Sequence, residues 1–171
     1  MFQILSEEVS DTLAVGRAVG GLARAGDVVA LDGPLGAGKT QFVRGLAEGL
    51  GLDPRHVSSP TFVFVQEYAP DPERDLATPV LVHVDAYRLE SSEQLQSIGW
   101  SDELLDGAVL AVEWAPRIVE ALGPDVLHVR IAHTGEGQRA IEIEGQGAWA
   151  ERMAGLMERT DRGNEPTGGR A

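Results

Sequence analysis

The chain has 171 residues, of which 43% are hydrophobic and 24% charged, a balance typical of a single soluble globular domain. It contains no cysteine, which excludes disulfides and thiolate metal sites, and no apolar run long enough to span a bilayer. The net charge of −13 would repel a phosphate backbone over most of the surface, so extended direct nucleic-acid binding is not expected. We therefore expect a cytoplasmic protein without membrane contact. Its acidity either serves solubility alone or marks a face that binds a basic partner.

The first part of the chain predicts a strand followed by a helix. Residues 2–5 are expected to form a short strand, and Ser6 is the expected N-cap of a helix that runs to about Ala25. Its apolar positions recur at helical spacing: Val9, Leu13, Val15, Ala18 and Leu22. Glycines at positions 16, 20 and 21 each weaken a helix by up to ~1 kcal/mol relative to alanine, so we expect this helix to depend on packing.

The next segment contains the pattern G-x-x-x-x-G-K-[ST], which is typical of phosphate-binding loops. Residues 33–40 read Gly-Pro-Leu-Gly-Ala-Gly-Lys-Thr. They follow an apolar run over residues 28–31, which predicts a buried strand, and precede apolar residues at helical spacing that end at Gly51. Lys39 is the only lysine among the 14 basic residues of the chain. This strand, loop and helix together predict a P-loop.

The chemistry of a P-loop assigns a role to each residue type. Glycines let backbone N–H groups turn toward phosphate oxygens, and the positive end of the following helix points to the same place. Lys39 is expected to reach the β- and γ-phosphates, and the Thr40 hydroxyl to bind Mg²⁺. The chain has no Asn-Lys-x-Asp motif for guanine, so ATP is favoured over GTP. The expected nucleotide-binding residues are Gly33, Leu35, Gly36, Ala37, Gly38, Lys39, Thr40 and Gln41.

The chain after the P-loop helix alternates between loops and strands. Pro60 biases the residue before it toward an extended conformation, so residues 57–62 are expected to form a rigid loop that enters a strand ending near Tyr68. Residues 69–78 contain two prolines and predict an exposed loop. The apolar run 80–85 predicts the next strand, which is a candidate antiparallel neighbour of the preceding one.

Short helices and a further strand are expected in the following part of the chain. One short helix is expected around residues 91–98 and another around residues 104–105. The apolar run 108–113 predicts another core strand. Pro116 is suited to the first turn of a brief helix that ends at Leu122.

The last third of the chain has a different pattern. Apolar and polar residues alternate over residues 127–131 and 141–144, which predicts half-buried antiparallel strands joined by a glycine-rich turn at 135–137. An apolar stripe at helical spacing predicts a packed helix: Trp149, Met153, Leu156 and Met157. We predict a single P-loop domain over residues 1–159 and a disordered tail over residues 160–171.

Two of the predicted strands end in an acidic residue, Asp85 and Glu113. Ligands of open parallel sheets bind outside the carboxyl ends of the strands, so both acids fall at the edge where the P-loop lies. A P-loop needs a carboxylate there to hold Mg²⁺ directly or through water, and the spacing does not decide which acid does so. Thr61 is a candidate sensor of the γ-phosphate and Arg88 a candidate for neutralising transition-state charge, although a structural role is the alternative for each. His83, which alternates with apolar neighbours, is interpreted as a core histidine.

Four motifs occur in order along the chain: Leu-Gly-Ala-Gly-Lys-Thr at 35–40, Ser-Pro-Thr-Phe at 59–62, His-Val-Asp-Ala-Tyr-Arg-Leu at 83–89 and Val-Glu-Trp at 112–114. With these motifs, the chain resembles the TsaE (YjeE) family of small bacterial P-loop ATPases over most of its length. The resemblance implies a part in making threonylcarbamoyladenosine, a modified nucleoside of tRNA. It also implies two protein partners, TsaB and TsaD, of which TsaD transfers the threonylcarbamoyl group. ATP binding would assemble the complex, and hydrolysis would reset it.

The resemblance implies roles for individual residues. Lys39 and Thr40 match the phosphate and Mg²⁺ ligands of the family. Asp85 and Glu113 match the acids needed for hydrolysis, with Glu113 the favoured metal contact. Trp114 matches a functional tryptophan.

Two segments match the switch-like segments of the family: residues 59–62, with Thr61, and residues 85–89, with Tyr87 and Arg88. One departure from the family pattern is Pro34, which stands where the family usually has an acid. Proline removes one backbone donor and stiffens the entry to the loop. We expect this to affect the dynamics of the loop more than nucleotide binding.

The elements predict an α/β fold, a P-loop NTPase-like three-layer sandwich with a mixed, mostly parallel central sheet and an antiparallel C-terminal part. The favoured function is a Mg²⁺-dependent switch ATPase with low intrinsic turnover that its partners stimulate. A small-molecule kinase of the P-loop class is an alternative, but such enzymes close an arginine-rich lid, and the loop at 71–78 contains only Arg74. A nucleotide-gated binding module that never hydrolyses ATP is a second alternative.

Overall fold

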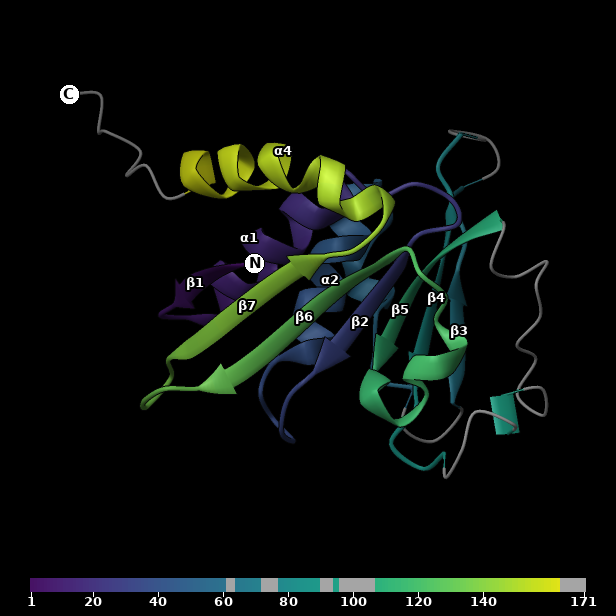
Figure 1. Cartoon of the computed structure of the whole chain (residues 1–171), viewed down its shortest axis with the longest axis horizontal. Coiled ribbons are helices and arrows are strands. Elements are labelled where there is room, and N and C mark those ends of the chain that lie inside the picture. The colour runs from purple at the N-terminus through teal and green to yellow at the C-terminus, as the bar shows by residue number, and fades with distance from the viewer. Residues whose placement is uncertain (61–63, 72–76, 90–93, 96–106, 164–171) are drawn as a thin grey trace.

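The computed structural model describes residues 1–60, 64–71, 77–89, 94–95 and 107–163 of the chain. Within these residues it contains one seven-stranded sheet and three α-helices (Figure 1). The strands are β1 (Phe2–Ser6), β2 (Val28–Asp32), β3 (Val65–Tyr68), β4 (Val80–Asp85), β5 (Ala108–Glu113), β6 (Val126–His133) and β7 (Arg139–Gly145). The helices are α1 (Val9–Gly20), α2 (Lys39–Leu50) and α4 (Ala148–Gly163). The 3₁₀ turns are η1 (Pro54–His56), η3 (Ala115–Arg117) and η4 (Val119–Ala121).

The order of the strands in the sheet is β1-β7-β6-β2-β5-β4-β3. The four central strands, β6, β2, β5 and β4, run parallel to one another, and antiparallel pairs complete both edges. This order confirms the predicted α/β fold, in which the sheet is mixed, its core is parallel and its C-terminal strands β6 and β7 are antiparallel. The predicted antiparallel pairing of β3 with β4 is also confirmed.

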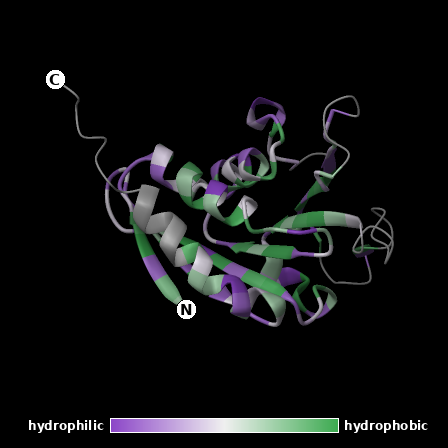
Figure 2. Ribbon diagram, turned by 90° about the horizontal axis from the view of Figure 1, so that it is seen from above, coloured by the Kyte–Doolittle hydropathy of each residue, from purple (hydrophilic) through white to green (hydrophobic). Residues whose placement is uncertain are grey.

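The parallel strands lie at the centre of the sheet because their side chains are buried on both faces. β5 is buried along its whole length, and β2 and β4 are buried at all but one residue each. In β6, by contrast, buried residues give way to an alternation of buried and more exposed residues. Figure 2 shows hydrophobic residues concentrated along the central strands. The burial pattern therefore separates the core of the sheet from its outer strands.

The helices cover one face of the sheet, and short turns cover the other (Figure 1). Helix residues such as Val19, Phe42 and Trp149 share one hydrophobic core with β2 and β6. On the opposite face, Ile118 and Leu122 share a second core with β4 and β5. The sheet is thus the middle layer between two cores.

Glycines allow α1 and α2 to pack against each other at close range. A Cβ atom at Gly16 would lie 2.2 Å from the Phe42 carbonyl oxygen, and one at Gly45 would lie 2.1 Å from the Leu13 carbonyl oxygen. These distances leave no room for any side chain. The glycines therefore lower the helix propensity of α1 but allow the backbone of α2 to approach closely. This agrees with the predicted dependence of α1 on packing.

Both ends of α1 differ from the prediction. Ser6 is not the N-cap, because pairing with β7 holds it as the last residue of β1. Glu8 is the N-cap instead, and its N–H donates a hydrogen bond to the Asp11 side chain at 3.1 Å. α1 also ends at Gly20 and not near Ala25, because two consecutive glycines interrupt the helical run there.

Other boundaries differ in the C-terminal half. α4 continues to Gly163, past Thr160, where the tail was expected to begin. The brief helix expected from Pro116 consists of two 3₁₀ turns. The short helices expected around residues 91–98 and 104–105 lie outside the described residues, apart from positions 94 and 95. Within the part of the chain that is described, no helix has both the length and the apolar character needed to cross a membrane.

Candidate functional site

The P-loop lies at the edge of the sheet where the parallel strands end. Residues 33–38 connect β2 to Lys39, the first residue of α2. The neighbouring strands β5 and β4 end at Glu113 and Asp85, which are opposite each other in the register of the two strands. The structure therefore brings both acids to the edge that carries the P-loop.

All three glycines of the loop, Gly33, Gly36 and Gly38, adopt backbone conformations that other residues rarely adopt. Gly33 has a φ of 147° and lies so close to β6 that a Cβ atom would be 2.2 Å from the Ile131 carbonyl oxygen. Gly38 is the N-cap of α2 and has a φ of 111°. Beyond Gly38, the first N–H groups of α2 have no partner within the helix, and they lie at its positive end. This backbone is suited to binding phosphate oxygens.

The Lys39 ammonium is folded back into the P-loop. Nζ donates hydrogen bonds to the carbonyl oxygens of Gly33 at 2.8 Å and Pro34 at 3.1 Å, and it lies 4.0 Å from the centroid of the Trp114 ring. Burial lowers the pKa of Lys39 below its usual value, while nearby carboxylates, chiefly that of Glu113, oppose the shift. Carbonyl oxygens of the loop therefore accept hydrogen bonds that the Lys39 ammonium would donate to a phosphate group when one is bound.

Thr40, Glu113 and His83 form a continuous series of hydrogen bonds. Thr40 Oγ1 donates to Glu113 Oε1 at 2.8 Å, and His83 Nε2 lies 2.9 Å from the same oxygen. Both His83 and Glu113 are buried. Burial would raise the pKa of Glu113, but hydrogen bonds from His83 and Thr40 and the charge of Lys39 hold that pKa below its usual value. Glu113 is therefore an ionised carboxylate with a defined orientation.

Asp85, Tyr87 and Trp114 lie beside this series. The buried Asp85 accepts a hydrogen bond from the Tyr87 N–H at its Oδ1, at 2.9 Å. The centroids of the Tyr87 and Trp114 rings are 5.0 Å apart. Trp114 has a φ of 61°, a left-handed conformation that is uncommon for a bulky residue and often occurs at functional sites. Trp114 thus connects the 85–89 segment with Lys39.

A cavity of about 370 Å³ lies among these groups. Most of its lining consists of residues predicted from the sequence: Leu35, Gly36, Gly38, Lys39, Thr40, Gln41, Asp85, Glu113 and Trp114. Val9, Ser59 and Arg139 complete the lining. The cavity extends from the carboxylates to the outer side of the P-loop, so it can hold a ligand longer than a single phosphate.

The other predicted residues lie beside the cavity or apart from it. Ala37 is buried in the loop, and its carbonyl oxygen accepts a hydrogen bond from Arg139 Nε at 2.8 Å. Arg88 is exposed and is not among the residues that line the cavity; its guanidinium lies 4.8 Å from the centroid of the Phe64 ring. Thr61 lies outside the described residues, so its role stays a prediction.

Two polar side chains contact the site although the sequence patterns do not assign them to it. Arg139 reaches the P-loop from the first position of β7, and its contact with Ala37 spans 102 positions of the chain. No local pattern signals such a contact. The sequence does contain an indication for His83: it precedes Asp85 by two positions, so both side chains lie on the same face of β4. His83 is buried as predicted, but it is bonded to Glu113 and not only packed among apolar residues.

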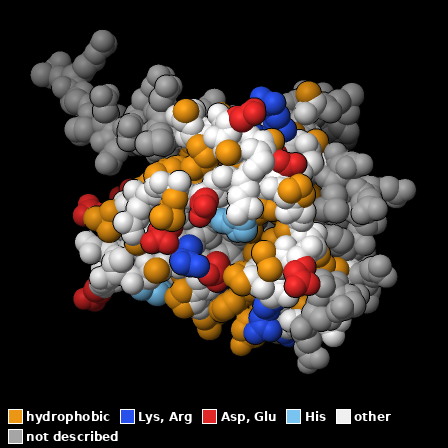
Figure 3. All heavy atoms as spheres, viewed as in Figure 1, with side chains coloured by type: hydrophobic (Ala, Val, Ile, Leu, Met, Phe, Trp, Pro, Cys, Tyr) orange, Lys and Arg blue, Asp and Glu red, His pale blue; other side chains and the backbone are white. Residues whose placement is uncertain are grey.

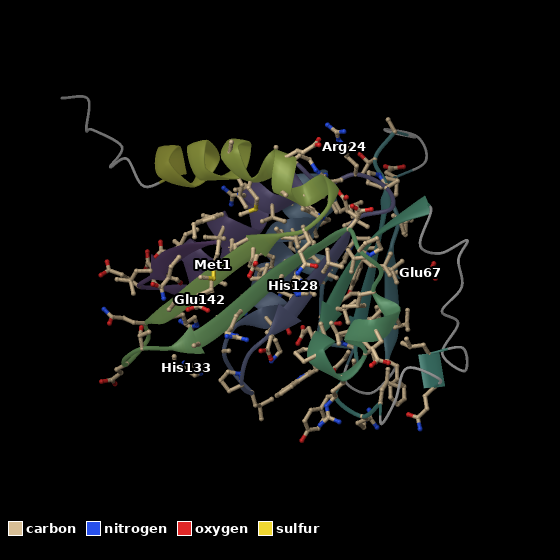
Figure 4. The ribbon with its side chains drawn as sticks, in the orientation of Figure 1. Met1, Arg24, Glu67, His128, His133 and Glu142 are labelled. Carbon is tan, nitrogen blue, oxygen red and sulfur yellow. The ribbon has the colours of Figure 1, made fainter. Side chains whose placement is uncertain are left out.

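A separate hollow of about 230 Å³ lies on the face of the sheet opposite to α1 and α2. Met1, His128 and Glu142 are among the residues that line it, and Figure 4 labels these three residues in front of β6 and β7. Figure 3 shows acidic, basic, histidine and hydrophobic side chains together on this face. No residue of the P-loop lines this hollow, so it is not part of the site.

The site is better suited to a phosphate ligand with a cation than to a metal ion alone. Within the described part of the chain, no group of three or more His, Asp or Glu side chains could hold a metal ion. A cation here would take ligands from Thr40 and the acids, and the remainder from phosphate and water. The Thr40 hydroxyl gives its one proton to Glu113, so its lone pairs remain available. The donor set therefore fits Mg²⁺ bound together with a phosphate group.

The fold and this loop define an α/β protein of the P-loop NTPase type. The model of the family described as threonylcarbamoyl adenosine biosynthesis protein TsaE matches residues 6–141. The chain belongs to the TsaE family, as the resemblance of its motifs indicates.

Individual relatives agree with this assignment. The tRNA threonylcarbamoyladenosine biosynthesis protein TsaE of Mycobacterium leprae is 40% identical over 75% of this chain and 80% of its own. Proteins with the same name are 41% identical in Streptomyces coelicolor, over 80% of this chain and 92% of theirs, and 36% identical in Bacillus subtilis, over 88% and 90%. The crystal structure of Bacillus subtilis YdiB matches with a TM-score of 0.69 and 29% identity over 96% of both chains.

Proposed function

We propose that this protein binds ATP with Mg²⁺, hydrolyses it slowly, and acts as a switch in the biosynthesis of threonylcarbamoyladenosine in tRNA. The observation that carries the proposal is the convergence of Lys39, Thr40 and Glu113 at the N-terminus of α2. The names of the relatives support the pathway. The cytoplasm is the compartment in which we propose that the protein acts.

The phosphates would lie at the positive end of α2. The N–H groups of residues 38–41 would donate to phosphate oxygens, and Lys39 would exchange its bonds to loop carbonyls for bonds to phosphate. When bound, Mg²⁺ neutralises part of the negative charge of the phosphates. The nucleoside would occupy the part of the cavity lined by Val9 and Arg139, since the carboxylates line the other part.

Glu113 and Asp85 would have different roles in hydrolysis. We assign Glu113 to Mg²⁺, together with Thr40, because these two side chains are already in contact at 2.8 Å. We assign Asp85 to the attacking water, because it lines the same cavity from the neighbouring strand. A carboxylate in that place can orient the water and accept its proton.

The switch would connect the nucleotide to the 85–89 segment. Lys39 contacts the Trp114 ring, which in turn contacts the Tyr87 ring. Movement of Lys39 toward a phosphate would remove the first of these contacts and alter the surface around the exposed Tyr87. TsaD and TsaB are the partners that we propose for this surface. A protein with a net charge of −13 would join them without holding the tRNA itself.

The proposal is tested by measuring ATP hydrolysis by the purified protein alone and with TsaB and TsaD, next to the Lys39→Ala variant. We expect slow turnover that the partners increase and the variant abolishes. ATP consumption that depends on an added small metabolite, with no effect of the partners, would replace the proposal with a P-loop kinase. Nucleotide-dependent partner binding without any hydrolysis would replace it with a nucleotide-gated binding module.

A further inference from the structure

His83 lies inside the protein next to Glu113, and the roles proposed above do not use it. Its side chain is fully buried, and Nε2 lies 2.9 Å from Glu113 Oε1. The other ring nitrogen, Nδ1, has no hydrogen-bond partner among the described residues. A buried polar atom without a partner is uncommon and calls for a physical reason.

The hydrogen-bond pattern specifies the form of the imidazole ring. An ionised carboxylate only accepts hydrogen bonds, so the proton between His83 and Glu113 is carried by Nε2. Among the described residues, Nδ1 has no acceptor for a proton of its own, so the bond to Glu113 is the one hydrogen bond of the ring that they show. His83 therefore donates a hydrogen bond to Glu113 through Nε2.

Two donors meet at one oxygen of Glu113. Oε1 accepts from the His83 imidazole behind it and from the Thr40 hydroxyl at the edge of the cavity. Two hydrogen bonds from different elements, β4 and α2, hold the carboxylate in one orientation. If the His83 donor were removed, Glu113 could turn toward Lys39, and the Thr40 proton would lose its acceptor.

We propose that His83 is a positioning residue for the Mg²⁺–nucleotide complex: its Nε2–H holds Glu113 Oε1 against the Thr40 hydroxyl, so that the lone pairs of that hydroxyl stay directed at the cation. This inference rests on the proposed nucleotide site. Hydrogen bonds that orient metal ligands in this way typically change metal affinity 10–100-fold when they are removed.

The test compares two variants of His83 with one control. His83→Leu fills a similar volume without a donor, and His83→Gln retains an N–H donor. His128→Leu is the control, because His128 is a half-buried strand histidine on β6 outside the cavity lining (Figure 4). The readout is calorimetric ADP binding over a range of Mg²⁺ concentrations and in EDTA.

We expect His83→Leu to raise the Mg²⁺ concentration needed for half-maximal tightening of ADP binding about tenfold, without changing ADP affinity in EDTA. His83→Gln should stay within about threefold of the wild type, and His128→Leu should match it. A folded His83→Leu variant with the Mg²⁺ dependence of the wild type would overturn the inference. A His83→Gln variant as impaired as His83→Leu would also overturn it, because the donor is then not the cause.

A second measurement uses only the wild type, so its result does not depend on whether a variant folds. Nitrogen NMR of the nucleotide-free wild type should show a proton on His83 Nε2, and an unprotonated Nε2 would overturn the inference. If the wild type fails to bind any nucleotide, the proposed function fails and the inference about Mg²⁺ fails with it. The NMR result would then still report on the contact between His83 and Glu113.

Discussion

The Lys39 ammonium lies 4.0 Å from the centroid of the Trp114 ring while it donates two hydrogen bonds to carbonyl oxygens of its own loop. Both kinds of contact stabilise the positive charge of Lys39, which would otherwise interact with a phosphate group. A contact between a cation and an aromatic ring contributes ~0.5–2 kcal/mol, depending on its exposure to water. Nucleotide binding therefore exchanges one set of contacts for another, and Trp114 is in a position to report the exchange.

We predict that nucleotide binding changes the fluorescence of Trp114, because it removes the charge from the face of the ring. Titration of the protein with ADP and Mg²⁺ should show an intensity change that Trp114→Phe abolishes. Trp149→Phe is the matched control, since Trp149 is buried in α4 away from the cavity lining. An undiminished change in Trp114→Phe would contradict the contact.

The close packing of α1 on α2 predicts that substituting glycine by alanine changes the free energy of unfolding in opposite directions at different positions. Gly16→Ala and Gly45→Ala should each lower the free energy of unfolding by ~2–3 kcal/mol or more, because each methyl group would meet a backbone carbonyl. Gly155→Ala in α4 should raise it by up to ~1 kcal/mol, because its Cβ would make only ordinary contacts, at 3.8 Å and beyond. Urea unfolding measures all three variants. Equal effects at the three positions would refute the packing argument.

The buried ion pair between Arg152 and Asp27 attaches α4 to the residue before β2. Both Nη atoms of the Arg152 guanidinium donate to the carboxylate, each at 2.6 Å. Arg152→Ala should lower the free energy of unfolding by ~3 kcal/mol, because it leaves a buried carboxylate without its cation. Arg17→Ala removes a largely exposed pair with Glu48 and should cost less than ~1 kcal/mol. Thermal and urea unfolding that gave similar losses for both variants would contradict the difference.

The lowered pKa of Glu113 predicts that the stability of the metal-free protein depends on pH. Its pKa in the folded state is lower than the usual 4.5, so its contribution to stability is fully present above pH 4.5 and is lost as the pH falls through the folded-state pKa. In Glu113→Gln, the free energy of unfolding in EDTA should therefore fall less steeply below pH 4.5 than in the wild type. Urea unfolding at a series of pH values measures both slopes. Identical slopes would show that the carboxylate is not held in its ionised form.

Much of the fold and most of the site could be predicted because they depend on residues close together in the chain. The pattern over residues 33–40 is local, and so is the burial pattern that distinguishes β5 from the alternating β6. The ends of α1 were predicted less well. Ser6 has the chemistry of an N-cap, but pairing with a strand more than 130 positions away holds it in the sheet.

The sequence by itself determined the P-loop, its lysine and threonine, the two strand-end acids and the mixed sheet, because each depends on the chemistry or periodicity of neighbouring residues. Only the tertiary structure decided which of these groups meet. The hydrogen bond of His83 with Glu113 joins residues 30 positions apart, and that of Arg139 with Ala37 joins residues 102 positions apart. Such contacts arise from the order of strands in the sheet. Their geometry is set by the packing of the whole chain, and no local pattern encodes it.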